Sequence, residues 1–187
     1  MKKITVVLIL MTNLYFAKAQ SGVQFGLKAG ANFSGWTGQL ATGSSLRTGF
    51  HAGGFAAIAL NASFAIKPEL FFSSEGIKVA NTKYIIDYVR LPILLQYRHS
   101  SGFQMETGPQ LGLLISGKLK SDVEETDVKN QFPPLEASWG IGLGFSLKSG
   151  PGFTLRYNFG LSKFGSNDDP FRTAVISAGL TYAFGGR

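Results

Sequence analysis

The sequence has no cysteine and few charged residues, and each shortage excludes classes of protein. With no cysteine among 187 residues, the chain has no disulfide scaffold, thiol nucleophile, thiolate metal site or lipid-modified N-terminal cysteine. Charged residues make up 16% and aromatic residues 13%, which excludes an intrinsically disordered chain. The length allows one domain or at most two small ones. Glycine is abundant, with 24 residues beside 16 phenylalanines, although it weakens helices and is unusual inside strands.

Long hydrophobic runs are also absent after the N-terminal region, where no stretch approaches the roughly 18 unbroken apolar residues of a transmembrane helix. The N-terminus begins with Lys2 and Lys3, continues with a short apolar run and closes with Ala17-Lys18-Ala19. This order predicts a secretory signal peptide over 1–19, cleaved before Gln20. Loss of its three lysines lowers the formal net charge from +7 to +4, and this slight, scattered charge indicates no nucleic-acid partner.

Apolar and polar residues alternate with a period of two along most of the remaining chain. The clearest case is 23–34, and 176–184 repeats it. This period is typical of β-strands, whose successive side chains point to opposite faces. It predicts eight strands, most of them 9 to 12 residues long, at 23–34, 49–60, 64–74, 85–98, 103–114, 138–147, 153–161 and 176–184.

Short and long connections alternate between these strands. Tight turns are expected at 61–63, 99–102 and 148–152. Longer polar loops are expected at 35–48, 75–84, 115–137 and 162–172. This alternation is typical of an up-and-down sheet, and an even strand number leaves both termini at the short-turn end. Because strands of about 10 residues tilted by about 45° also fit a bilayer, residues 20–187 are predicted to form an all-β fold, an eight-stranded antiparallel up-and-down transmembrane β-barrel.

The alternation fits two orientations of the barrel wall. In a soluble lipocalin-like barrel the apolar face would line a ligand cavity, whereas in a membrane barrel it would contact lipid and the polar face would fill the lumen. Glycine favours the membrane barrel, because small residues make room in a narrow lumen but weaken strands on a wet exterior. Ten strand glycines fall on the polar phase: Gly26, Gly30, Gly53, Gly108, Gly112, Gly140, Gly142, Gly144, Gly160 and Gly179.

Charged residues of both signs also fall on the polar phase and form a predicted lumen polar network. Its members are Lys28, Lys67, Glu69, Arg90, Glu106 and Arg156. The uncharged residues on this phase are Gln24, Gln96, Gln104, Gln110 and Asn158. Enclosed charges must be paired or hydrated, so four cations and two anions predict a paired polar plug with some trapped water. A narrow porin-like channel for ions or small solutes is the alternative.

Four segments carry a resemblance to a known family. They are 25–33, 67–72, 88–97 and 155–161, and the Leu-Pro-Ile-Leu-Leu-Gln-Tyr strand within the third is the most specific. In this order they resemble the outer-membrane β-barrel domain of Bacteroidetes-type bacteria, the porin family or PorT-like group. Such proteins often carry Glu before an Ile-Pro pair, where this chain has Arg90 before Leu91-Pro92. The resemblance implies an eight-stranded outer-membrane barrel in a family whose members mostly have no assigned activity.

Three prolines lie inside predicted strands, namely Pro68, Pro92 and Pro109. Proline cannot donate a hydrogen bond to a ladder, and a closed barrel has no free edge to accommodate it. We therefore expect bulges or gaps in the ladder at these positions.

Aromatic residues gather near both strand ends, which predicts two girdles at the membrane interfaces. The loop-end group is Trp36, Tyr84, Trp139, Phe164 and Phe171, and the turn-end group is Phe64, Tyr97, Phe103, Phe153, Tyr182 and Phe184. The terminal strand, with Phe184 at its aromatic end, is expected to be the signal for the barrel assembly machinery.

The sequence offers little for catalysis. Its only histidines are His51 and His99, of which His99 falls in a predicted turn, and spacing connects no serine and carboxylate to His51. The glycine run at 140–144 is not followed by a helix, as a phosphate loop would be. No metal-ligand cluster is present either, so we expect no enzyme activity, no cofactor and no metal.

Binding through the loops is the functional alternative to a purely structural role, since loops on rigid scaffolds often carry recognition. Candidate contact residues are Lys118, Lys120, Asp122, Glu124, Glu125, Asp127 and Lys129, and the last loop adds Asn167, Asp168 and Asp169. Such charged runs are usually only solvated, and the alternative is recognition of a protein partner or a cation at these loops. We expect outer-membrane lipid around the barrel and a location in the outer membrane.

Overall fold

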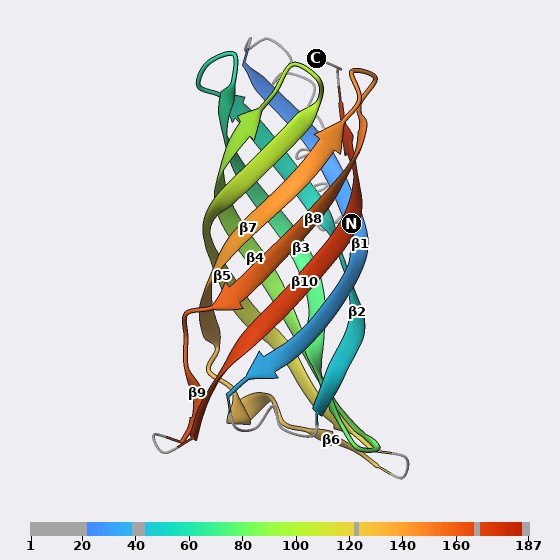
Figure 1. The fold of residues 1–187 in the computed structure, drawn as a ribbon. Coiled ribbons are helices and arrows are strands. Elements are labelled where there is room, and N and C mark those ends of the chain that lie inside the picture. The colour runs from blue at the N-terminus through green and yellow to red at the C-terminus, as the bar shows by residue number, and fades with distance from the viewer. Residues whose placement is uncertain (1–21, 39–43, 122–123, 167–168, 185–187) are drawn as a thin grey trace, which may run out of the picture.

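The computed structural model describes residues 22–38, 44–121, 124–166 and 169–184, so the predicted signal peptide at 1–19 lies outside the described residues. Eight long strands dominate the structure (Figure 1). They are β1 (Val23–Thr37), β2 (Ser44–Ala59), β3 (Phe64–Val79), β4 (Thr82–Arg98), β5 (Phe103–Lys120), β7 (Leu135–Ser146), β8 (Pro151–Gly160) and β10 (Asp169–Ala183). The long connections contain two short strands, β6 (Glu125–Asp127) and β9 (Phe164–Ser166), and a 3-10 helix, η3 (Lys129–Gln131).

The long strands form one closed antiparallel barrel. Each pairs with its neighbours in sequence, and β1 pairs with β10 from Gly26–Ala183 to Thr37–Arg172. The start of β1 and the end of β10 therefore lie together, at the end with the short turns (Figure 1). The predicted eight-stranded up-and-down barrel is confirmed. Within the described ranges, no helix has the length and apolar character needed to cross a membrane.

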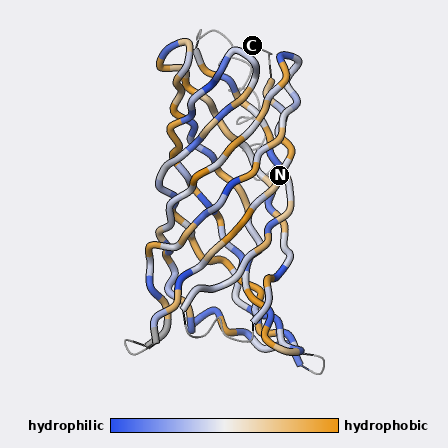
Figure 2. Tube along the Cα trace, viewed as in Figure 1, coloured by the Kyte–Doolittle hydropathy of each residue, from blue (hydrophilic) through white to orange (hydrophobic). Residues whose placement is uncertain are grey.

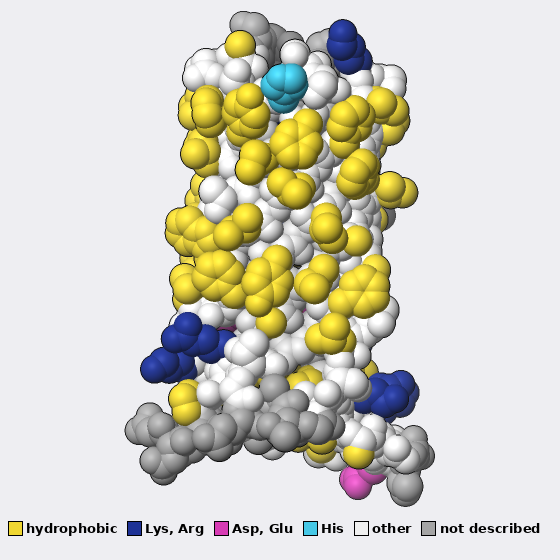
Figure 3. Space-filling model, in the orientation of Figure 1, with side chains coloured by type: hydrophobic (Ala, Val, Ile, Leu, Met, Phe, Trp, Pro, Cys, Tyr) yellow, Lys and Arg dark blue, Asp and Glu magenta, His cyan; other side chains and the backbone are white. Residues whose placement is uncertain are grey.

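Apolar and polar residues alternate along the strands (Figure 2). The exposure of the side chains places the apolar ones outside and the polar ones inside. Leu70 and Leu180 on the outer surface are 58% and 72% exposed, and Figure 3 shows a band of apolar side chains between the turns and the loops. Inside, the charged side chains of Lys67 and Glu69 are each 2% exposed. A lipocalin-like barrel would have the opposite arrangement, so that alternative is wrong.

The strands run further at the loop end than the alternation predicts. β3 continues to Val79 and β4 begins at Thr82, so the loop predicted at 75–84 is wrong and a tight turn of Ala80 and Asn81 replaces it, with Ala80 in the left-handed region at φ 49°. The loops predicted at 35–48, 115–137 and 162–172 are also partly strand. Beyond the lipid-facing band the outer face needs no apolar residues, so the alternation fades while the backbone ladder continues.

The three predicted tight turns are confirmed, since the chain between the long strands spans only 60–63, 99–102 and 147–150 at this end. Prolines interrupt the ladder without shifting its register. Pairing is missing at Pro68 between β2 and β3, opposite Pro92 between β3 and β4, and opposite Pro109 between β4 and β5. The predicted gaps are thus confirmed, whereas the register shifts lie away from the prolines, at 46–51 and 87–88.

Candidate functional site

Arg156 on β8 is the centre of an ion-pair network in the half of the lumen nearer the short turns. Its guanidinium donates to Glu69 on β3 at 2.8 and 2.9 Å and to Glu106 on β5 at 2.8 Å. Lys28 on β1 contacts Glu69 at 2.8 Å, and Lys67 on β3 lies 3.3 Å from Glu69 and 3.1 Å from Glu106. All five side chains are buried. These five residues, three cations and two carboxylates, are called the turn-side network.

Arg90 on β4 is the centre of a second network, nearer the loops. Its guanidinium donates to Glu75 on β3 at 3.1 and 2.5 Å and pairs with Glu136 on β7. The hydroxyl of Ser73 donates to Glu75 at 2.7 Å, and that of Thr173 on β10 donates to Glu136. We call Arg90, Glu75 and Glu136 the loop-side network, in which one cation lies between two carboxylates. Together the two networks contain four cations and four carboxylates, so their formal charges balance.

The structure places all six predicted members of the lumen polar network inside the barrel, but in two separate networks. Sequence reasoning missed Glu75 and Glu136 because it assigned both to loops. Their phase was the available signal, since Glu75 continues the alternation of Lys67 and Glu69. The predicted ratio of four cations to two anions is therefore wrong for the described residues. Arg90, the departure from the family pattern, has both of its counter-ions among the residues that were missed.

Asn32 and His51 extend the loop-side network. The amide nitrogen of Asn32 donates to the hydroxyl of Ser73 at 2.9 Å, and its amide oxygen lies 2.9 Å from His51 Nδ1. Both residues are buried, whereas His99 is exposed in its turn, with Nδ1 2.9 Å from the Ser101 hydroxyl. Across the described ranges, no three or more His, Asp or Glu side chains are grouped so that they could hold a metal ion.

The predicted uncharged residues line the rest of the lumen. Gln96, Gln104, Gln110 and Asn158 are buried, and Gln24 is half-buried. Gln96 donates to Gln104 at 3.1 Å, and Gln104 donates to the Ser146 hydroxyl at 2.7 Å near the short turns. These bonds continue the polar filling of the lumen to its turn end.

Inward glycines make room for the charged side chains. The backbone of Gly112 lies against the Arg90 guanidinium, so that a Cβ at this position would overlap it. Gly142 lies opposite Arg156 in the β7–β8 ladder, and a Cβ there would come within 3.1 Å of Glu106. The placement of the ten polar-phase glycines on the inner face is confirmed, since each is buried or half-buried.

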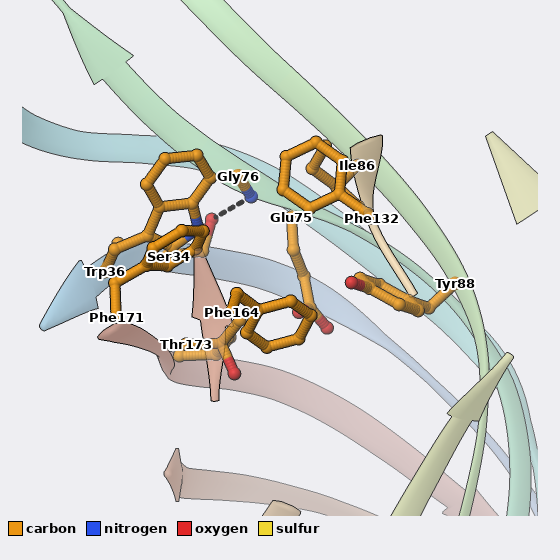
Figure 4. A pocket seen from close by; sticks show the side chains of 12 residues that line it. Ser34, Trp36, Glu75, Gly76, Ile86, Tyr88, Phe132, Phe164, Phe171 and Thr173 are labelled. Carbon is orange, nitrogen blue, oxygen red and sulfur yellow. Dashed lines mark hydrogen bonds between the residues drawn. The ribbon is translucent and has the colours of Figure 1, made fainter. Parts of the chain in front are cut away.

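Five aromatic side chains cover the loop end of the lumen, and Figure 4 shows four of them, namely Trp36, Phe132, Phe164 and Phe171. Trp36 stacks on Phe171 with ring centroids 4.4 Å apart, and Phe171 stacks on Phe164 at 5.5 Å. Tyr84 and Phe132 lie 5.3 and 6.0 Å from Trp36. We call these five residues the aromatic cover. It lies over Glu75 and Tyr88, and so separates the loop-side network from the loops.

The aromatic cover corrects the predicted loop-end girdle. Trp36, Tyr84, Phe164 and Phe171 pack against one another instead of facing lipid, and of that group only Trp139 lies on the outer face, 36% exposed. The reason is phase, since Trp36 follows inward-facing Ser34 by two positions and Phe171 precedes Thr173 by two. The turn-end girdle is confirmed, because its six members lie on the outer face and are exposed or half-buried.

Little free volume remains at either end of the lumen. A cavity of about 10 Å³ lies beneath the aromatic cover, and one of about 20 Å³ lies near Lys67 and Gln96 at the turn end. A single water needs about 10–15 Å³, so each cavity has room for roughly one water molecule. The lumen is filled by protein side chains.

After β6, the chain at 128–134 folds back over the loop end of the barrel. The Val128 amide donates to the Gly117 carbonyl at 2.9 Å, and the Leu114 amide donates to the Pro134 carbonyl at 2.9 Å. Val128 is buried, and Phe132 belongs to the aromatic cover. The tip formed by the end of β5 and by β6 is exposed and can contact other molecules.

The described loop-contact residues lie along this tip, apart from Lys129, which begins η3. Lys118, Lys120, Glu124, Glu125, Asp127 and Lys129 are all exposed, whereas Asp122, Asn167 and Asp168 lie outside the described residues. Lys118 lies 2.6 Å from Glu125, and this hydrogen bond holds the pKa of the Glu125 carboxyl below its ordinary value. Asp127 accepts a hydrogen bond from the Lys129 amide at 2.8 Å. The structure thus brings Lys118 and Glu125 together and leaves the other charged side chains exposed to solvent.

Comparisons with known proteins agree with this geometry. No curated protein matches the sequence. Neisserial surface protein A is similar in structure, with a TM-score of 0.56 at 15% identity over 88% of this chain and 100% of that one. Ail, the attachment invasion locus protein of Yersinia pestis, gives a TM-score of 0.50 at 14% identity, over 87% and 100% of the two chains. Both similarities concern the fold alone. Residues 17–165 match the model of the outer membrane protein beta-barrel domain, and the chain belongs to this family.

Proposed function

We propose that this outer-membrane barrel is a closed scaffold with a structural or interaction role at its loop end, rather than a channel for ions or small solutes. The single observation that supports this proposal most directly is the filled lumen. Two buried ion-pair networks occupy it in succession, and the aromatic cover lies above them.

The energetic cost of opening this lumen is high. A passing ion would have to separate buried pairs such as Arg156–Glu69 and Arg90–Glu75. Breaking a buried pair by removing one partner costs about 3–5 kcal/mol, and the lumen holds several such pairs. The barrel wall is narrow as well, since eight strands leave an interior just wide enough for side chains to fill it.

Conductance in a planar lipid bilayer tests the closed lumen. The purified full-length protein is expected to give no steady conductance, whereas an open porin in the same bilayer gives ohmic steps. Steady ohmic steps that disappear in Gly142→Val would overturn the proposal, because that substitution adds volume beside Glu106. Gly54→Val is the matched control, since Gly54 lies on the outer phase of β2.

The interaction role is supported by the exposed, mixed-charge tip of β5 and β6. Its test is replacement of 121–127 by a Gly-Ser segment of equal length. This choice leaves Val128 and Phe132 in place, because both help to close the barrel. Loss of specific partners in pull-down experiments is expected, with an unchanged folded barrel. The same partners and the same cell phenotype after the replacement would contradict the role.

We also propose the finer placement in the PorT-like group, with export by the signal peptide at 1–19 and insertion by the barrel assembly machinery. The resemblance of 88–97 to that group and the A-x-A motif before Gln20 support this view. N-terminal sequencing of the mature protein is expected to begin at Gln20, and a retained Met1 would contradict it.

A further inference from the structure

Three lysines form a continuous row across the outer face of the barrel wall at its loop end. Lys78 on β3 pairs in register with Lys83 on β4, and Lys83 pairs with Lys120 on β5. All three side chains are exposed. Directly opposed residues of an antiparallel pair have Cβ atoms about 4.5–5.5 Å apart, and like charges at that spacing destabilise the sheet. We call Lys78, Lys83 and Lys120 the lysine row.

The protein provides little counter-charge for the lysine row. None of its three members makes an ion pair with a carboxylate in the described part of the chain. Glu125 lies opposite Lys120 in the β5–β6 ladder and bonds to Lys118, so its single negative charge is shared between these two lysines. Asp87, on the same side of β4, pairs in register with Ser116 and not with a member of the row. The row therefore presents a positive charge that an external anion would neutralise.

The lysine row lies where the lipid-facing band ends. On β5 the outer face carries exposed Leu111, Leu113 and Ile115 before Lys118 and Lys120. On β4, exposed Leu91 is followed along the outer face, in the direction of the loops, by residues that end with Lys83. Figure 3 shows the same order on the face in view, where Lys and Arg side chains lie between the apolar band and the loops. A molecule with acyl chains and an anionic head fits this change from apolar to cationic surface.

We propose that the lysine row binds the phosphate group of an anionic lipid in the outer leaflet. Its acyl chains would lie against Leu91 and Leu113, and the ammonium groups would donate to the phosphate oxygens. The proposal rests on the outward orientation of the loop end, which follows the general rule that long loops of such barrels are extracellular. The lipid is favoured over an acidic protein segment because the row continues directly from the lipid-facing surface.

The test compares two triple variants of the full-length chain in phosphatidylcholine nanodiscs with and without phosphatidic acid. The row variant is K78Q/K83Q/K120Q. The control is K129Q/K148Q/K163Q, which removes the same charge at other exposed lysines. The readout is the midpoint of thermal unfolding, followed by the loss of the folded band on an unheated detergent gel. Each sample must first show that folded band. A variant that does not insert would show that the substitutions disturb the folded barrel, and the binding comparison uses only samples that do insert.

Phosphatidic acid is expected to raise the midpoint for the native and control proteins and to leave the row variant unchanged. The row variant should need on the order of a hundredfold more phosphatidic acid for an equal effect, from three lysines of about fivefold each. An equal rise in the row variant would overturn the proposal. So would an equal rise of the native protein with inorganic phosphate alone, which would indicate a free anion, or with poly-glutamate alone, which would indicate a protein partner.

Discussion

At the scale of single residues, Arg156 shows how a charged side chain is accommodated inside this narrow barrel. Its planar guanidinium meets Glu69 with two parallel hydrogen bonds and reaches Glu106 with a third. This geometry suits arginine better than lysine, because lysine donates from a single compact point. Gly140 leaves space for this side chain, since a Cβ at that position would lie 3.3 Å from Arg156 Cδ.

Arg156→Met is expected to lower the free energy of unfolding by about 3–5 kcal/mol, because the two carboxylates lose a buried partner. Urea titration of the protein in lipid vesicles measures this loss. Arg172→Met is the control, since Arg172 is exposed at the loop end and its loss should cost less than about 0.5 kcal/mol. Adding Glu106→Gln to Arg156→Met should recover part of the stability. If Arg156→Met and Arg172→Met lowered the free energy of unfolding equally, this result would contradict a stabilising turn-side network.

The burial of single charged residues could be predicted from the sequence where the outer face of the barrel is apolar. The six predicted charged residues lie in that region, and all are buried as their phase indicated. Glu75 lies nearer the loops, where Ser74 and Gly76 replace apolar residues on the outer phase and the alternation weakens. Glu136 still alternates with Leu135 and Ala137, but it falls outside the strand that was predicted to begin at 138. Their partner Arg90 was identified, but the residues that neutralise it were not.

At the scale of elements, the loop ends of the strands close the barrel. β1, β4, β9 and β10 each contribute a ring to the aromatic cover, and the loop after η3 adds Phe132. Sequence could place these aromatics near strand ends, but a girdle and a cover require the same composition there. Phase distinguishes the two for Trp36 and Phe171 once the strands are known to extend into the predicted loops. The position of Phe132 depends instead on the folding back of the long loop, which brings together residues distant in sequence.

Phe171→Ala is expected to open the aromatic cover to water, because Phe171 stacks between Trp36 and Phe164. The chain has two tryptophans, so a Trp139→Phe background leaves Trp36 as the reporter. In that background, Phe171→Ala should shift the emission to longer wavelength and increase quenching by acrylamide. Phe103→Ala on the outer face at the turn end is the control. Unchanged quenching after Phe171→Ala would contradict the cover.

At the scale of the whole molecule, the barrel has no free edge along its eight long strands, because β1 and β10 pair along their length. A closed ladder satisfies the backbone groups of the strands internally, which is required in a bilayer. This closure was the most predictable property of the chain. It follows from an even number of alternating segments and from the short and long connections, both of which are local in sequence.

The closed barrel is expected to remain folded in detergent until it is heated. The unheated protein should migrate differently from the heated protein on a detergent gel, and cell fractionation should recover it with the outer membrane. The reason is that all neighbouring long strands are joined, so no strand can separate without breaking two ladders. Identical migration together with recovery in the soluble fraction would contradict a membrane barrel.

The pairing of β1 with β10 also has a consequence for how the barrel folds. Every other pair of neighbouring long strands is joined by a single turn or loop, whereas this pair joins residues from the two ends of the described chain. Closing so long a segment costs the most chain entropy, and non-local pairing is slow. We therefore expect hairpins between adjacent strands to form first and the pairing of β1 with β10 to complete the barrel.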